Sequence, residues 1–268
     1  MIDRGKRNVL GVYVDAVDYA AATDKILAAA RDQRPMAVTA LAVHGVMTGV
    51  SDRAHEARLN SFDVVTPDGQ PVRWALNLLH KARLSDRVYG PTLTMRVVER
   101  AAAEGLPIYL YGSTQPVLDK LSAALTAQFP DLTIAGAEPS KFRTAEPGEP
   151  EEIAKRISDS GARIVLVGLG CPRQEIFVHA MRPLLPMPLL AVGAAFDYHS
   201  GGLRKPPPWM QERGLEWLWR LGLEPRRLWR RYLILNPAYL GRLTAQATHL
   251  WPARPAEPST TPAESFPV

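Results

Sequence analysis

The chain has 268 residues, of which 46% are hydrophobic and 22% are charged, and this composition is typical of a globular protein with a sizeable core. Cys171 is its single cysteine, which excludes an intrachain disulfide and a zinc site built from several cysteines. The first twenty residues lack the apolar run of a signal peptide, and no stretch reaches the ~18–20 apolar residues of a spanning helix. We therefore expect a cytoplasmic protein whose membrane contacts are peripheral.

Short apolar runs alternate with longer amphipathic stretches along the first 200 residues. Apolar positions three or four apart predict helices at 92–103, 116–129 and 150–160. This alternation indicates an α/β fold over residues 1–205, with a Rossmann-like, doubly wound, mainly parallel sheet. The predicted strands lie at 9–14, 37–41, 64–65, 108–111, 132–134, 164–167 and 189–192.

The C-terminal part has a different composition. Residues 204–242 hold nine Lys or Arg and three Glu, and five of the six tryptophans lie beyond residue 208. We predict two helices over 209–239, split near Pro225, and a disordered Pro-, Ser- and Thr-rich tail at 252–268. Arg227, Arg230 and Arg231 share one helix face. Residues 206–251 thus predict a basic helical appendage that docks on an anionic membrane surface or folds over a bound diphosphate.

Glycine-bearing turns follow three of the predicted strands, in YLYGST (109–114), VGLGCPRQE (167–175) and AVGAAFD (191–197). Parallel sheets bind ligands at the carboxyl ends of their strands, where backbone amides can approach phosphate or ribose. Any one of these turns can also be explained by tight-turn geometry alone. Their recurrence favours a ligand site at this edge.

Polar residues follow two other strands. Asp68 lies in a Pro-Asp-Gly turn after the strand at 64–65, where its carboxylate can serve as a general base or simply form the turn. Thr39 and His44 belong to AVTALAVHGVMTGV and can reach the same edge, although we favour a structural role for His44. The sequence has no Asp-x-Asp pair to hold a divalent cation. We therefore expect no metal cofactor, with arginines or helix N-termini meeting the charge of an anionic ligand.

Six motifs are spread along the chain in this order: TPDGQPVRW, RVYGP, YLYGST, VGLGCPRQE, AVGAAFDYHSGGLRKPPPWMQ and GLEWLWRLGLEPRRLWRRYLILNP. Together they resemble the WecG/TagA/CpsF family of bacterial glycosyltransferases, and the resemblance runs from about Leu10 to Tyr239. The resemblance implies an inverting, metal-independent enzyme that uses a UDP-sugar donor and an undecaprenyl-diphosphate-linked acceptor at the inner face of the cell membrane. Donors in the family include UDP-N-acetylmannosamine, its uronic acid and UDP-glucose, and its products include teichoic acid and exopolysaccharide.

The resemblance also implies roles for individual residues. Asp68 matches the catalytic base, Thr39 its companion, and the appendage arginines would stabilise diphosphate charge. The chain has Leu41 and Val43 where Thr-x-Asn-x-Asp/Glu-His is frequent in the family, so the donor preference of teichoic-acid enzymes is not carried over. The appendage arginines are Arg220, Arg227 and Arg230, and the substrate-binding residues are Arg87, Gly112, Gly168, Gln174, Asp197 and His44.

Two alternatives to a glycosyltransferase are a non-catalytic binding protein and a dehydrogenase. A non-catalytic nucleotide- or polyanion-binding protein would use the same sheet edge and basic helix. A dehydrogenase is disfavoured because no Gly-x-Gly-x-x-Gly turn follows the first strand. No recognisable nucleic-acid module is present, so we expect no nucleic-acid partner. The donor sugar, the acceptor sugar and assembly into a homo-oligomer are left open by the sequence.

Overall fold

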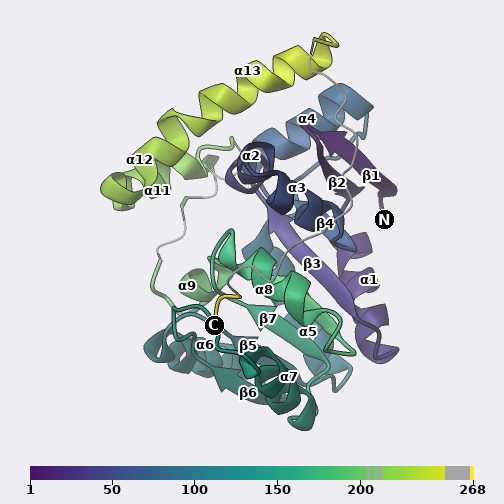
Figure 1. Ribbon diagram of the computed structural model, residues 1–268, viewed down its shortest axis with the longest axis vertical. Helices are drawn as coiled ribbons and strands as arrows, with labels where there is room; N and C mark the ends of the chain where they lie inside the picture. Colours follow the sequence, from purple (N-terminus) through teal and green to yellow (C-terminus); the bar gives the residue numbers. More distant parts are fainter. Residues whose placement is uncertain (204–205, 208, 211–212, 251–265) are drawn as a thin grey trace.

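The computed structural model describes residues 1–203, 206–207, 209–210, 213–250 and 266–268, with the backbone alone for Arg227 and Arg231. Within these residues, a six-stranded parallel sheet carries helices on both faces (Figure 1). This arrangement confirms the predicted doubly wound α/β fold. The strand order is β4 (Val64–Pro67), β3 (Met36–Leu41), β8 (Pro188–Ala191), β7 (Ile164–Val167), β5 (Ile108–Tyr111) and β6 (Ile134–Glu138).

The central strands are buried on both faces, which is why they read as continuous apolar runs. In β7, Ile164 and Leu166 point into one core while Val165 and Val167 point into the other, and all four are fully buried. The face of the sheet that carries Ile164 and Leu166 is covered by α1 (Tyr19–Arg31), α5 (Gly90–Ala103), α6 (Gln115–Gln128) and α9 (Ala195–His199). The opposite face, which carries Val165 and Val167, is covered by α2 (Val43–Ser51), α3 (Arg53–Asn60), α4 (Gln70–His80), α7 (Glu149–Asp159) and α8 (Arg173–Met181).

The three helices predicted between strands correspond to α5, α6 and α7, with bounds shifted by one or two residues. Each of them carries a proline in its first turn, where the missing N–H removes no helical hydrogen bond. Two other helices begin at an aspartate cap. Asp18 accepts from the N–H of Ala21 at 2.9 Å, and Asp52 accepts from the N–H of His55 at 3.1 Å.

The strand expected at 9–14 is wrong in one respect, because the chain reverses within it. Leu10 and Gly11 have φ of +58° and +102°, and this turn joins β1 (Asp3–Val9) to β2 (Val12–Val17) in a separate antiparallel hairpin. Asp15 of β2 ties the hairpin to the main sheet. Its carboxylate is nearly fully buried, and its Oδ2 accepts from the N–H of Val65 at 2.7 Å and from Lys6 Nζ at 3.0 Å.

The C-terminal segment contains α11 (Glu216–Leu223), α12 (Pro225–Leu233) and α13 (Leu235–Ala247). The break at Pro225 is as predicted, whereas the prediction of two helices is wrong, because the chain breaks again at Ile234. The helix α13 packs across α2 and α4 at the top of Figure 1. Its Tyr239 is fully buried and donates through its hydroxyl to the carbonyl of Pro71 at 3.2 Å, and Leu243 joins the same core. One end of the expected appendage is therefore part of the main hydrophobic core.

The last three residues lie against the body, which differs from the disorder expected of the whole tail. Val268 exchanges backbone hydrogen bonds with Arg143, at 3.0 and 3.3 Å, and is fully buried. The ring of Phe266 stacks on Phe177 at 5.2 Å. Apolar burial explains why these residues leave the solvent, and residues 251–265 of the tail lie outside the described part. No described helix is long and apolar enough to cross a bilayer.

Candidate active site

A cavity of about 560 Å³ opens at the carboxyl ends of β3, β4, β7 and β8, where open α/β sheets bind ligands. Its size is within the range of small-molecule sites. One wall comes from the loops that follow these strands, and the opposite wall comes from α11, α12 and the start of α13. The predicted site residues that line it are His44, Asp68, Arg87, Gly168, Gln174, Asp197 and Arg220.

Asp68 directly follows β4 and is half-buried in this cavity. Its backbone N–H donates to the carbonyl of Leu41 at 3.2 Å, and its Oδ1 accepts from the N–H of Gly90, the first residue of α5, at 3.0 Å. Burial raises the pKa of Asp68 to about 6, although Arg87 and the Gly90 hydrogen bond act in the opposite direction. A carboxyl with a pKa near neutrality is suited to accept a proton from a hydroxyl group.

Two arginines from distant parts of the chain, Arg87 and Arg220, line the same cavity as Asp68, and their charges lower its pKa. Arg87 lies over the ring of Tyr89 at 4.3 Å and forms an ion pair with Glu216 of α11 at 2.5 Å, with both side chains about nine-tenths buried. Arg220, one turn further along α11, lies 5.9 Å from the ring centre of Tyr198. Its Nε has no hydrogen-bond partner among the described residues. The cavity therefore offers positive charge next to the carboxylate.

The predicted glycines differ in position. Gly168 lines the cavity, and a Cβ there would meet the ring of Phe196 at 2.5 Å. Gly112 has φ of +99°, and a Cβ there would meet Leu169 Cδ2 at 2.7 Å. Gly112 is not a lining residue, although its neighbour Ser113 is. Its geometry explains why glycine is needed where two turns approach each other, and its predicted substrate contact stays a prediction.

Thr39 does not line the cavity and is fully buried. Its hydroxyl donates to Glu175 Oε1 at 3.1 Å, and Gln174 Nε2 donates to the same oxygen at 2.9 Å. Thr39 therefore reaches the cavity wall through Glu175, which does line it. The sequence did not identify Glu175 and Glu216 as site residues. Their only signal was membership of the motifs VGLGCPRQE and GLEWLWR, beside residues that were singled out.

The structure does not place the other two appendage arginines, Arg227 and Arg230, at the cavity. The side chain of Arg230 is exposed, lies 5.3 Å from the ring centre of Trp229 and is not among the lining residues. The side chain of Arg227 lies outside the described part of the chain. Of these three arginines, the geometry supports a contact with a ligand in this cavity for Arg220, while the roles of Arg227 and Arg230 stay predictions.

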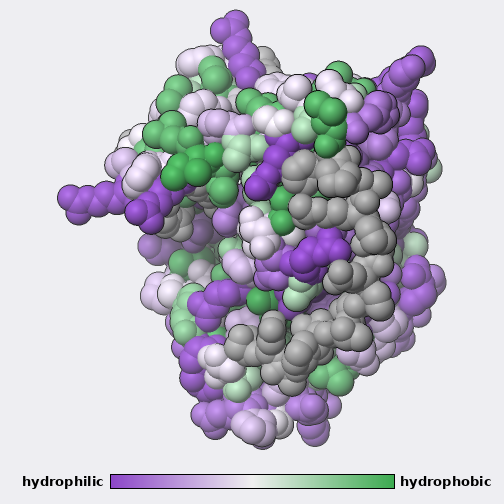
Figure 2. Space-filling view, turned by 45° about the horizontal axis from the view of Figure 1, so that its top comes forward, coloured by the Kyte–Doolittle hydropathy of each residue, from purple (hydrophilic) through white to green (hydrophobic). Residues whose placement is uncertain are grey.

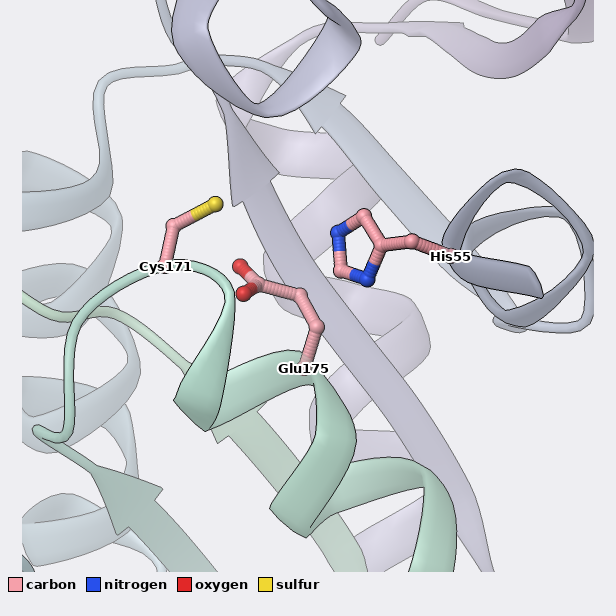
Figure 3. Close-up of side chains that lie close together, drawn as sticks. All are labelled: His55, Cys171 and Glu175. Carbon is pink, nitrogen blue, oxygen red and sulfur yellow. The ribbon is translucent and has the colours of Figure 1, made fainter. Parts of the chain in front are cut away.

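Beside the cavity, one group of side chains combines the residue types that bind metal ions. His55, Cys171 and Glu175 come from α3, from the turn after β7 and from α8, and their ligand-type atoms lie within 4.8 Å of one another (Figure 3). His55 and Glu175 are each about 1% exposed. Figure 3 shows the Glu175 carboxylate between the Cys171 thiol and the His55 ring, with its oxygens on the side of Cys171. Whether this cluster suits a cation depends on which ring nitrogen of His55 carries the proton.

The fold and the site define an α/β protein with a polar cavity at the carboxyl edge of its sheet, and comparison with known families assigns its class. Residues 7–252 match the glycosyl transferase WecG/TagA/CpsF family, and the chain belongs to that family. A curated relative is the N-acetylglucosaminyldiphosphoundecaprenol N-acetyl-beta-D-mannosaminyltransferase of Bacillus spizizenii. It is 30% identical over 212 residues, which cover 73% of this chain and 80% of the relative.

Proposed function

We propose that the protein is an inverting glycosyltransferase that moves a hexose or N-acetylhexosamine from a UDP-sugar to a polyprenyl-diphosphate-linked sugar. The observation that carries the proposal is the Asp68 carboxylate, whose pKa is raised to about 6 in a cavity that also holds Arg87 and Arg220. Membership of a glycosyltransferase family supports the reaction class. The name of the curated relative supports a polyprenyl-linked amino sugar as the acceptor.

In the proposed reaction, the acceptor hydroxyl attacks the anomeric carbon of the donor from the face opposite the diphosphate. Asp68 takes the hydroxyl proton as the new C–O bond forms, which is the role of a general base. The bond between the anomeric carbon and the diphosphate oxygen breaks, and its electron pair leaves with UDP. A single displacement of this kind inverts the configuration at the anomeric carbon.

Negative charge develops on the departing diphosphate, and Arg220 is the residue best suited to meet it. Its guanidinium lines the cavity, and its Nε is free to donate because it has no partner within the described residues. Arg87 contributes a second positive charge and is held in place by Glu216. Two arginines can supply the stabilisation that a divalent cation gives in other transferases, so we propose a metal-independent reaction.

We further propose that α11 and α12 rest on an anionic membrane surface at the cytoplasmic face. Large apolar side chains are exposed here, with Leu218 at 48%, Trp229 at 44% and Leu233 at 57%, near basic residues such as Arg226 and Arg230. Figure 2 shows hydrophobic surface at the end of the molecule where α11 and α12 lie, close to long projecting hydrophilic side chains. Such a surface suits interfacial binding without a spanning helix.

The test is transfer by the purified full chain. Donors such as UDP-N-acetylmannosamine and UDP-glucose are mixed with a short-chain polyprenyl diphosphate carrying N-acetylglucosamine, and the product is detected by mass spectrometry. NMR coupling constants of the product then report the anomeric configuration. Transfer with inversion supports the proposal. Binding of UDP without transfer to any acceptor of this type contradicts it and favours a non-catalytic nucleotide-binding protein.

A further inference from the structure

Glu175 is a buried carboxylate to which the proposed reaction gives no role. It lies in the first turn of α8, directly after Gln174, and its side chain reaches toward β3 and α3. Burial raises the pKa of Glu175, while hydrogen bonds from Gln174, Thr39 and Cys171 favour its charged form. Several donors therefore converge on one carboxylate at the cavity wall.

These hydrogen bonds determine the orientation of the Gln174 side chain. A charged carboxylate only accepts hydrogen bonds, so the amide nitrogen of Gln174 must face Glu175 Oε1, at 2.9 Å. The backbone N–H of Gly170 only donates, so the amide oxygen must face it, at 3.2 Å. Because Gln174 lines the cavity, Glu175 decides which of its groups are presented to a ligand there.

His55 lies beside the Glu175 carboxylate, and its tautomer can be deduced. Arg58 Nη1 lies 3.0 Å from His55 Nδ1, and a guanidinium always donates, so Nδ1 must accept and the ring proton must be on Nε2. Burial and the nearby Arg58 charge lower the pKa of His55 to about 4, which keeps the ring neutral. The Glu175 carboxylate lies within 4.8 Å of the His55 ring. Among the described residues, neither His55 Nε2 nor Glu175 Oε2 has a hydrogen-bond partner, so the proton on Nε2 is available to a carboxylate this close.

The same tautomer argues against a zinc ion among His55, Cys171 and Glu175. Zinc would have to bind His55 Nε2, which carries the proton as long as Arg58 donates to Nδ1. Metal-bound histidines also usually donate from the other nitrogen to an acceptor, and here that nitrogen faces a cation. The group is better explained as a hydrogen-bond network.

We propose that Glu175, with the neutral His55 ring beside it, is a positioning residue that fixes the Gln174 amide in the orientation that receives the donor. This inference rests on the transfer reaction proposed above. In a Glu175→Gln variant, one amide oxygen replaces two carboxylate oxygens, while Thr39, Gln174 and His55 still present donors. At least one donor then loses its acceptor, and the Gln174 amide is free to turn over.

The first experiment measures donor and acceptor KM, kcat and thermal stability of the Glu175→Gln and His55→Phe variants. Donor KM should rise about tenfold in Glu175→Gln and less in His55→Phe, with acceptor KM unchanged, because a hydrogen bond to a charged group is lost. A merely structural role would lower kcat through a smaller folded fraction without moving donor KM. Glu56→Gln is the matched control, since Glu56 is a buried carboxylate on α3 that does not line the cavity.

The outcomes separate the two proposals. If the wild type transfers no sugar, the proposed function fails. If the wild type transfers sugar and Glu175→Gln keeps its donor KM, the positioning role is overturned.

A second measurement needs no activity. In ¹⁵N spectra of histidine side chains, assigned with a His55→Gln variant, His55 of the wild type should remain the neutral Nε2–H tautomer from pH 8 to about pH 5. Addition of Zn²⁺ alone should leave its signals unchanged. An Nδ1–H tautomer, or stoichiometric zinc binding that shifts these signals, would overturn the network.

Discussion

The two walls of the cavity are built in different ways. On the sheet side, Asp68 and Gln174 directly follow strand ends or turns, and each is oriented by hydrogen bonds to backbone N–H groups. On the helical side, Arg220 comes from α11, whose Glu216 forms an ion pair with Arg87 of the body. Backbone hydrogen bonds thus fix the side chains of the sheet wall, as the proposed proton transfer requires, whereas the helical wall brings charge and an exposed apolar surface. The predictions below test this division.

The largest effect is expected for Asp68→Asn on the sheet wall. Removing the base should lower kcat by ~10²–10⁴-fold while UDP affinity and thermal stability change little, since an amide oxygen can still accept from the N–H of Gly90. Steady-state kinetics and calorimetric UDP titration check both points. Asp159→Asn, at an exposed position, is the control. A variant that keeps near-normal turnover would show that another group takes the proton.

On the helical wall, Arg220→Ala should lower kcat by about 10²-fold, which is the usual cost of removing one donor to a developing charge. Arg230→Ala should cost less than about threefold in a detergent assay, because its side chain is exposed and outside the lining. Turnover of both variants with the same donor gives the comparison. Equal losses would mean that Arg230 also reaches the diphosphate.

The pH dependence of kcat/KM should reflect Asp68. Its pKa is raised from 3.8 to about 6, so the base is protonated and inactive below that value and ionised above it. Log kcat/KM should therefore fall by about one unit per pH unit below pH 6 and level off above it. The residual activity of Asp68→Asn should lack this acidic limb. A limb at pH 4 instead would show that burial does not raise this pKa.

Membrane binding should depend on the outer surface of the helical wall. Deletion of the whole segment would also remove Tyr239 and Leu243 from the core, so Leu218→Glu and Leu233→Glu are sharper tests. Each should weaken sedimentation with anionic liposomes about tenfold or more, since a buried leucine is worth ~1.5–3 kcal/mol. UDP affinity should be unaffected. Unchanged sedimentation of both variants would place the membrane contact elsewhere.

The smallest effect is expected from chelation. Turnover in EDTA should stay within about twofold of turnover with Mg²⁺ or Mn²⁺, because Arg220 and Arg87 supply the positive charge of the cavity. Rates of metal-stripped enzyme with and without each ion check this. Strict dependence on either ion would mean that these two arginines do not meet the charge alone.

The fold was predictable because local patterns carry it. Apolar runs such as 164–167 predict buried parallel strands, and the turn after β4 indicates Asp68 as a candidate site residue. The reversal at Leu10-Gly11 was hidden inside one apolar run, so the hairpin was read as a single strand. Glu175 and Glu216 could not be predicted, because their partners, Thr39 and Arg87, are brought to them only by tertiary packing.

The hairpin contact of Asp15 has a consequence for how the protein behaves in concentrated solution. β4 is an edge strand of the sheet, and the unpaired N–H groups of an uncovered edge strand can form hydrogen bonds with a strand of another molecule. Here the carboxylate of Asp15 takes the N–H of Val65, and β2 lies alongside. A buried acidic side chain ends the ladder where a neighbouring molecule would otherwise extend it, so this edge is protected against intermolecular strand pairing and the aggregation that follows from it.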